Sequence, residues 1–308
     1  MAKTAIALAL GSGAARGWSH IGVIDVLTEA GIKPDIICGT SMGALVGAVH
    51  ASGRLEALRD WAMEADWRAV AAMVDINVLG GGLVDGANIV KWLTGLGLPE
   101  SIEGLDIPFT AVATDIGSGR EIWLQSGPLA PAIRASIGMP GLFSPTPIEG
   151  RWLADGGLVN PVPVSPCRAM GADYIIAVNL NDDLLGRKLV TDPAPAPADL
   201  PKPETLLDLI RSIPASVQAQ MSSLSFFGAG SQTPGYFDVL TNAIDIMQDH
   251  ITRSRLAGEP PHAMILPAVS TIGLLEFHRA AEAIAAGRAA AERALPAIEA
   301  HLGTLPRG

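Results

Sequence analysis

A pentapeptide with glycine at both ends and serine at its centre, Gly39-Thr-Ser-Met-Gly43, sets the local topology of this chain. The predicted strand 35–38 precedes it, and residues 42–51, which are mostly small, follow it with helical spacing. A G-x-S-x-G sequence between a strand and a helix is typical of a nucleophile elbow, a sharp turn that exposes a serine hydroxyl. The alternative is a serine that only caps the helix. We therefore expect Ser41 to be a nucleophile, with Gly39 and Gly43 leaving room for the strained turn.

The same order of strand, turn and helix is repeated along the N-terminal half. Residues 4–10 form an apolar run, residues 18–30 have helical spacing, and the second strand follows at once. This alternation predicts an α/β fold of three layers, with a mostly parallel central sheet between two layers of helices. Further strands are expected at 108–113, 121–124, 151–154 and 173–180, with 108–113 and 121–124 forming a hairpin, and further helices at 55–73, 128–137, 237–256 and 275–302.

Composition divides the chain of 308 residues into three parts. Residues 1–182 are expected to form the catalytic core, and residues 236–308 a helical segment that packs on it. Residues 183–235 are rich in proline and glycine and are predicted to be a mobile excursion or lid. Within this part, residues 224–230 contain two phenylalanines. They either touch lipid or pack their rings on the core.

Charge and cysteine content exclude several classes of protein. The formal net charge is −10 and no run of Lys or Arg occurs, so nucleic-acid binding is not expected. Cys38 and Cys167 are the two cysteines, far apart in sequence, and they predict buried thiols rather than a disulfide framework or a zinc site. No apolar stretch is long enough to span a membrane. The N-terminal apolar run leads directly into a glycine-rich turn, so it reads as a strand, not a signal peptide, and a cytoplasmic location is expected.

The turn after the first strand, residues 11–17, consists mostly of small residues. Its backbone N–H groups are candidates for holding an oxyanion. The alternative is a dinucleotide-binding fingerprint, but Arg16 occupies the position of its third glycine. The end of the second strand also carries Cys38 and Gly39 where an acidic residue would hold a ribose. No nucleotide cofactor is therefore expected.

Asp155 is the candidate partner of Ser41. It ends the predicted strand 151–154 and begins the sequence Asp155-Gly156-Gly157. Catalytic sites in such sheets form where strands end, so this carboxylate is expected to reach Ser41. A turn-forming aspartate is the alternative. A Ser-His-Asp triad with His250 or His262 as base is also left open by the sequence.

Five runs of sequence, in this order, resemble the bacterial patatin-like phospholipases, in the branch similar to the catalytic domain of neuropathy target esterase. They are Leu8–Ile24, Gly39–Ala48, Ala113–Asp115, Arg134–Phe143 and Asp155–Pro163, and residues 275–287 also resemble the end of this branch. The resemblance covers roughly residues 4–181. It implies a patatin-like fold and an acyl hydrolase that works through a Ser–Asp dyad, without histidine, metal or organic cofactor.

The resemblance also assigns roles to single residues. Ser41 matches the nucleophile, Asp155 the base, and positions 12–14 the oxyanion loop, in which the family usually has three glycines. Ser12, Gly13 and Ala14 stand there instead, and positive φ angles are harder for Ser12 and Ala14. Arg16 matches the basic residue of the loop, and Met42 joins the substrate-binding set.

The chemistry implied is attack of Ser41 on a lipid ester or another acyl ester, with peripheral contact to a membrane. An aspartate at its ordinary pKa is a weak base, so we expect burial to raise the pKa of Asp155. The alternative is a non-catalytic patatin-like protein that binds lipid or regulates a partner.

Overall fold

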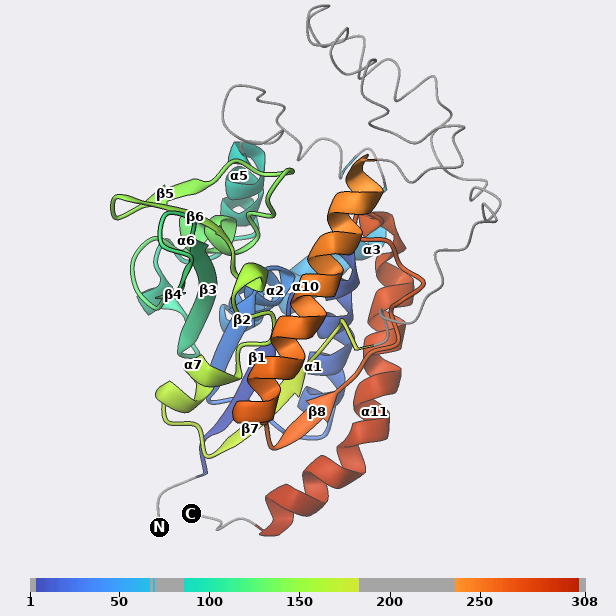
Figure 1. Ribbon diagram of the computed structural model, residues 1–308. Coiled ribbons are helices and arrows are strands. Elements are labelled where there is room, and N and C mark those ends of the chain that lie inside the picture. Colours follow the sequence, from blue (N-terminus) through green and yellow to red (C-terminus); the bar gives the residue numbers. More distant parts are fainter. Residues whose placement is uncertain (1–3, 67–68, 70–85, 183–235, 305–308) are drawn as a thin grey trace, which may run out of the picture. The chain divides into compact units, whose positions relative to one another are not determined.

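A sheet of eight strands organises the computed structural model, which describes residues 4–66, 69, 86–182 and 236–304 (Figure 1). The strand order is β5-β6-β3-β2-β1-β7-β8, and β4 also pairs with β3. Strands β3, β2, β1, β7 and β8 are parallel neighbours, while β4, β5 and β6 pair antiparallel. The strands are β1 (Ile6–Leu10), β2 (Ile36–Thr40), β3 (Phe109–Asp115), β4 (Arg120–Leu124), β5 (Thr146–Ile148), β6 (Arg151–Asp155), β7 (Tyr174–Val178) and β8 (Ala263–Ile265).

Helices accompany the strands in chain order. They are α1 (Ser19–Glu29), α2 (Met42–Ala51), α3 (Leu55–Glu64), α5 (Ala87–Gly95), α6 (Leu129–Ser136), α7 (Val164–Ala169), α10 (Tyr236–Gly258) and α11 (Ala280–Thr304), with 3-10 turns η1 (Ala14–Trp18), η2 (Ile102–Gly104), η3 (Gly156–Leu158) and η4 (Phe277–Arg279). The described parts of residues 1–183 and 247–308 form one compact unit. Residues 236–246, the first part of α10, belong to a second unit.

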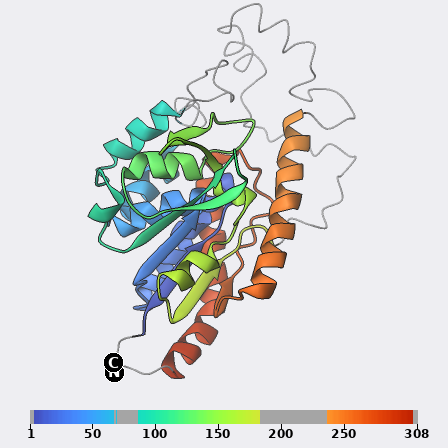
Figure 2. The same ribbon diagram turned by 60° about the vertical axis from the view of Figure 1, so that its left-hand side comes forward.

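The central strands bury both faces, and each face has its own core. Leu8 and Leu10 of β1 point into a large apolar cluster with side chains of α1, α2, α6 and α11. Ala7 and Ala9 point to the other face, into a smaller cluster with side chains of α7. Figure 2 shows the parallel strands side by side, with helices on either side of them. The predicted three-layer architecture is confirmed.

Strands β2 and β6 lie end to end along one edge of β3. Strand β2 pairs with residues 109–112 and β6 with residues 113–115, while β4 pairs with residues 111–115 and so fills the opposite edge. Two hydrogen bonds just outside β3 support this arrangement. Pro108 O accepts from Ile37 N of β2, and Ile116 N donates to Trp152 O of β6. Since β6 runs antiparallel, its last residue meets the last residue of β2. This insertion brings the residues after Thr40 beside Asp155.

Two glycines let helix α11 approach α1 closely. A Cβ on Gly22 would lie 2.1 Å from Ile284 O, and a Cβ on Gly287 would lie 1.9 Å from Ser19 O. No side chain fits between the two backbones at this crossing. The C-terminal helix is thereby fixed on the helix that follows the glycine-rich loop.

Most predicted elements are present within a few residues of their expected limits. The helix expected at 55–73 is observed as α3 over Leu55–Glu64, and the one expected at 275–302 begins at Ala280, after the 3-10 turn η4. The prediction missed β5, β8, α5 and α7, which are too short to produce a clear periodicity. The predicted excursion 183–235 and its segment 224–230 lie outside the described residues, and the domain limits remain predictions.

The two cysteines, distant in sequence, belong to one buried cluster. Cys38 on β2 and Cys167 on α7 are both fully buried free thiols. Burial raises the pKa of the Cys167 thiol well above its ordinary value, and neighbouring Cys38 adds to this. The prediction of buried thiols is confirmed.

Candidate active site

The turn between β2 and α2 holds Ser41 in a conformation that few L-residues adopt. Its φ is 56° and its ψ is −126°. The flanking glycines are required by close backbone contacts, since a Cβ on Gly39 would lie 2.4 Å from Gly43 O, and one on Gly43 would lie 2.1 Å from Leu10 O. Strain of this kind persists only where the surrounding structure enforces it, which is common at functional sites.

The Ser41 hydroxyl points to the carboxylate at the end of β6. Ser41 Oγ donates a hydrogen bond of 2.7 Å to Asp155 Oδ2. Both side chains are nearly buried, with exposed fractions of 7% and 5%. Ser41 makes no side-chain capping hydrogen bond to α2, so the alternative of a simple helix cap does not describe its hydroxyl.

The second oxygen of Asp155 is held by its own turn. Asp155 Oδ1 accepts a hydrogen bond of 2.7 Å from Gly157 N, so the carboxylate both forms the turn and binds Ser41. Gly156 is required here because a Cβ would lie 2.2 Å from Val112 O. Burial raises the pKa of Asp155 to about 6, although the hydrogen bonds from Ser41 and Gly157 act in the opposite direction. The shift has the expected direction, and no charged side chain among the described residues contributes to it.

Three hydroxyl groups that sequence reasoning did not assign fix the backbone of the two turns. Ser136 Oγ accepts from Ser41 N at 2.9 Å and donates to Val112 O at 2.6 Å. Thr40 Oγ1 donates to Asn160 O, and Thr114 Oγ1 donates to Asp155 O. Ser136 lies within the run 134–143 used for the family resemblance, so the sequence did contain a signal for it.

The glycine-rich loop after β1 lies at the same edge of the sheet, and its amides differ in availability. Ser12 N donates to Pro161 O at 2.8 Å, which removes it from the expected donor set. Across residues 4–66, 86–182 and 236–304, the N–H groups of Gly13 and Ala14 have no acceptor. Ala14 adopts a φ of 47°, the positive angle expected to be difficult, whereas Ser12 does not.

The remaining predicted residues of the loop region have mainly structural contacts. Arg16 is 5% exposed, and its Nε donates to Ile272 O at 2.9 Å. Met42, the first residue of α2, packs on Gly17, where a Cβ would lie 2.3 Å from Met42 Cβ. Its amide is at the N-terminus of α2, where backbone N–H groups attract negative charge.

The histidines do not lie between Ser41 and Asp155, since these two side chains bond directly. His262 Nδ1 accepts from Ile175 N in the middle of β7, and His250 is exposed on α10. His20 Nε2 bonds to Gly11 O at 2.8 Å, and burial lowers its pKa to about 4, so this ring supports the glycine-rich loop as a neutral group. The triad alternative therefore has no support in this arrangement.

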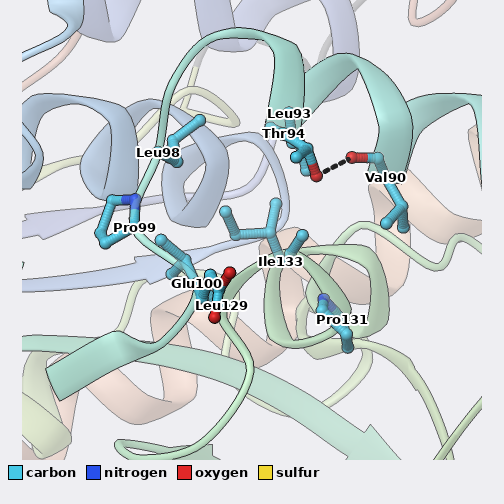
Figure 3. Close-up of a pocket in the computed structure, with 10 residues that line it drawn as sticks. Val90, Leu93, Thr94, Leu98, Pro99, Glu100, Leu129, Pro131 and Ile133 are labelled. Carbon is cyan, nitrogen blue, oxygen red and sulfur yellow. Dashed lines mark hydrogen bonds between the residues drawn. The ribbon is translucent and has the colours of Figure 1, made fainter. Parts of the chain in front are cut away.

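The described part of the chain offers little for other kinds of site. It holds no group of three or more His, Cys, Asp or Glu side chains that could bind a metal ion. None of its helices is both long and apolar enough to cross a bilayer. A cavity of about 210 Å³ between α5 and α6 is lined mainly by apolar side chains such as Leu93, Leu129 and Ile133 (Figure 3). None of the candidate active-site residues lines it.

Comparison with known proteins gives matches over this region and beyond. The family model described as Patatin-like phospholipase matches residues 8–168. An uncharacterized NTE family protein of Mycobacterium tuberculosis is 40% identical over 331 residues, covering 96% of this chain and 92% of its own. Human patatin-like phospholipase domain-containing protein 6 is 34% identical over 182 residues, which is 57% of this chain and 13% of that protein. Among solved structures, VipD from Legionella pneumophila matches with a TM-score of 0.43 and 15% identity, over 96% of this chain and 67% of that one.

Proposed function

Since the chain belongs to the patatin-like phospholipase family, we propose that it is a serine acyl hydrolase that cleaves lipid esters through Ser41 and Asp155. The observation that carries this proposal is the hydrogen bond of 2.7 Å between Ser41 Oγ and Asp155 Oδ2, in a buried site at the strand ends. The hydroxyl is already aligned with the group that would accept its proton.

In the first half of the reaction, Ser41 Oγ attacks the carbonyl carbon of the ester while its proton passes to Asp155 Oδ2. The carbonyl oxygen becomes an oxyanion. Breaking of the bond to the alcohol then releases that alcohol, which takes the proton from Asp155 and leaves an acyl group on Ser41. In the second half, a water gives its proton to Asp155 and attacks the acyl carbon. The fatty acid leaves, and the proton returns to Ser41.

The oxyanion needs donors that are fixed before the reaction begins. We propose that the amides of Gly13, Ala14 and Met42 donate hydrogen bonds to the oxyanion. The N-terminus of α2, which begins at Met42, adds a favourable dipole. Ser12 is not in this set because its amide bonds to Pro161 O. Ala14 has a φ of 47°, a strained angle for alanine, and we propose that the direction of its amide depends on this angle.

A lipid substrate would bring the protein to a membrane surface as a peripheral protein, and a cytoplasmic location stays a prediction. The second candidate remains a non-catalytic lipid-binding or regulatory protein of the same fold. The hydrogen bond between Ser41 and Asp155 favours the enzyme, because a binding protein has no need for a buried carboxylate aligned on a serine. The two candidates differ in turnover, which can be measured directly.

The pH dependence of hydrolysis tests the proposed base. Asp155 must be ionised to accept the proton, and its pKa is about 6. We expect kcat/KM for a water-soluble nitrophenyl ester to fall on the acid side with an apparent pKa near this value, so that activity at pH 5 is roughly tenfold lower than at pH 7.5.

Temperature separates a carboxylate from a histidine in this experiment. Carboxyl ionisation has almost no enthalpy, so the acid limb should stay in place between 15 and 35 °C, whereas an imidazole limb would move. A limb near pH 4, or one that moves with temperature, would contradict Asp155 as the base. Absence of turnover on any ester would favour the lipid-binding protein.

A further inference from the structure

The side chain of Gln248, in the second half of α10, reaches the edge of the sheet where the candidate active site lies. It is 8% exposed. Its Oε1 accepts a hydrogen bond of 2.8 Å from Ser12 Oγ and one of 3.2 Å from Asn181 Nδ2. One carbonyl oxygen thus joins the oxyanion loop after β1 to the segment after β7.

The nitrogen of the same amide contacts the turn of the catalytic base. A Cβ on Gly157 would lie 2.4 Å from Gln248 Nε2 and 3.0 Å from Asp155 Oδ1. Gly157 is the residue whose amide donates to Asp155 Oδ1. Gln248 therefore touches both halves of the site, the loop that would hold the oxyanion and the turn that holds the base.

We propose that Gln248 is a positioning residue that couples the oxyanion loop to the Asp155 turn. The inference rests on the proposed function. It explains why this chain has a serine at position 12, since the Ser12 hydroxyl is the group that Gln248 binds. Glutamine suits the position because its carbonyl oxygen accepts from two donors, while its neutral nitrogen lies against Gly157 in the Asp155 turn.

Several charged or titratable groups of the elements around the site have partners of their own, including Arg134 of α6, whose Nη2 donates to Ser144 O. Arg16 of η1 bonds to Ile272 O, and His20 of α1 bonds to Gly11 O. On α10, Asp249 pairs with Arg253, and Arg255 pairs with Glu121 of β4. No charged side chain in the described part of the chain shifts the pKa of Asp155, so a new carboxylate at position 248 would be the first to do so.

The first test measures coupling between the two partners. Gln248→Ala is expected to lower kcat about tenfold with KM changed less than twofold, because the donors and the base lose their relative position after substrate is bound. Ser12→Ala should cause a similar loss, and the double variant should lose no more than the worse single variant. Met247→Ala, the exposed neighbour on α10, is the matched control and should behave as wild type.

The second test is a readout that a purely structural role would not change. Gln248→Glu keeps the size of the side chain but places a carboxylate beside Asp155, so the acid limb of kcat/KM should move up by about one pH unit. Melting temperatures of all variants report folding. Additive losses from Ser12→Ala and Gln248→Ala, or an unmoved acid limb in folded Gln248→Glu, would overturn this inference alone. Wild-type protein without ester hydrolysis would instead overturn the proposed function.

Discussion

Asp155→Asn is expected to abolish ester hydrolysis and to stabilise the fold. Asparagine has nearly the same shape but cannot take the proton from Ser41, so kcat should fall by about 10²–10⁴-fold. At the same time the variant lacks a charge that the native protein keeps buried, at an exposed fraction of 5%. Loss of function together with a gain in stability is typical of a catalytic group whose burial destabilises the fold.

The pH dependence of this gain follows from the sign of the pKa shift. Burial raises the pKa of Asp155 from 3.8 to about 6, so the folded state holds this proton more tightly than the unfolded state. Wild-type stability therefore decreases as pH rises through this interval, and the cost, on the order of 3 kcal/mol, is fully present at pH 7.5. Asp155→Asn should melt at a higher temperature than wild type at pH 7.5 and at about the same temperature at pH 4. A variant less stable than wild type at pH 7.5 would contradict the burial of a charged Asp155.

Gly43→Ala is expected to damage both the fold and the activity through a single methyl group. The new Cβ would lie 2.1 Å from Leu10 O and 2.7 Å from Gly11 O, which are backbone atoms that no rotamer change can move. Relief requires a shift of the elbow against the end of β1. We expect the free energy of unfolding to fall by about 1–3 kcal/mol, a common cost of overpacking.

The effect of Gly43→Ala on catalysis should persist in protein that remains folded. The elbow carries Ser41, and the end of β1 continues into the loop with Gly13 and Ala14. A shift of the elbow relative to this loop would move Ser41 away from its proper position beside the oxyanion donors. The kcat should therefore fall about 10²-fold even in folded protein. Gly95→Ala is the matched control, since nothing lies within 4 Å of its Cβ in helix α5, and it should preserve both activity and melting temperature. Equal behaviour of the two variants would show that the elbow has more room than the contacts indicate.

The elbow and the layers could be predicted because their signals are local in sequence. The pattern from Gly39 to Gly43 needs only its flanking strand and helix to be interpreted. Asp155 was harder, because its place beside Ser41 depends on the antiparallel insertion of β6 along the edge of β3, and no periodicity encodes that pairing. What made it predictable was the glycine pair after it and the resemblance of the run around it.

The finer geometry of the site could not be predicted, since it depends on contacts between distant segments. Ser12 and Gln248 are separated by 236 positions, and residue 248 lies in an unremarkable helical pattern. The oxyanion loop was recognised, but which of its amides is engaged depends on Pro161 O, in the segment after β6. Short strands such as β5 and β8, with three residues each, form because they pair with a neighbouring strand, and their own sequence carries no clear signal.

The central claim, that Ser41 is a nucleophile activated by Asp155, is tested most directly with a fluorophosphonate probe. Such a probe reacts with an activated serine and leaves a covalent adduct, which mass spectrometry of peptides can locate. We predict one adduct, on Ser41, which is absent in Ser41→Ala and forms far more slowly in Asp155→Asn. No adduct on folded wild-type protein, or an adduct on another serine that persists in Ser41→Ala, would contradict the claim.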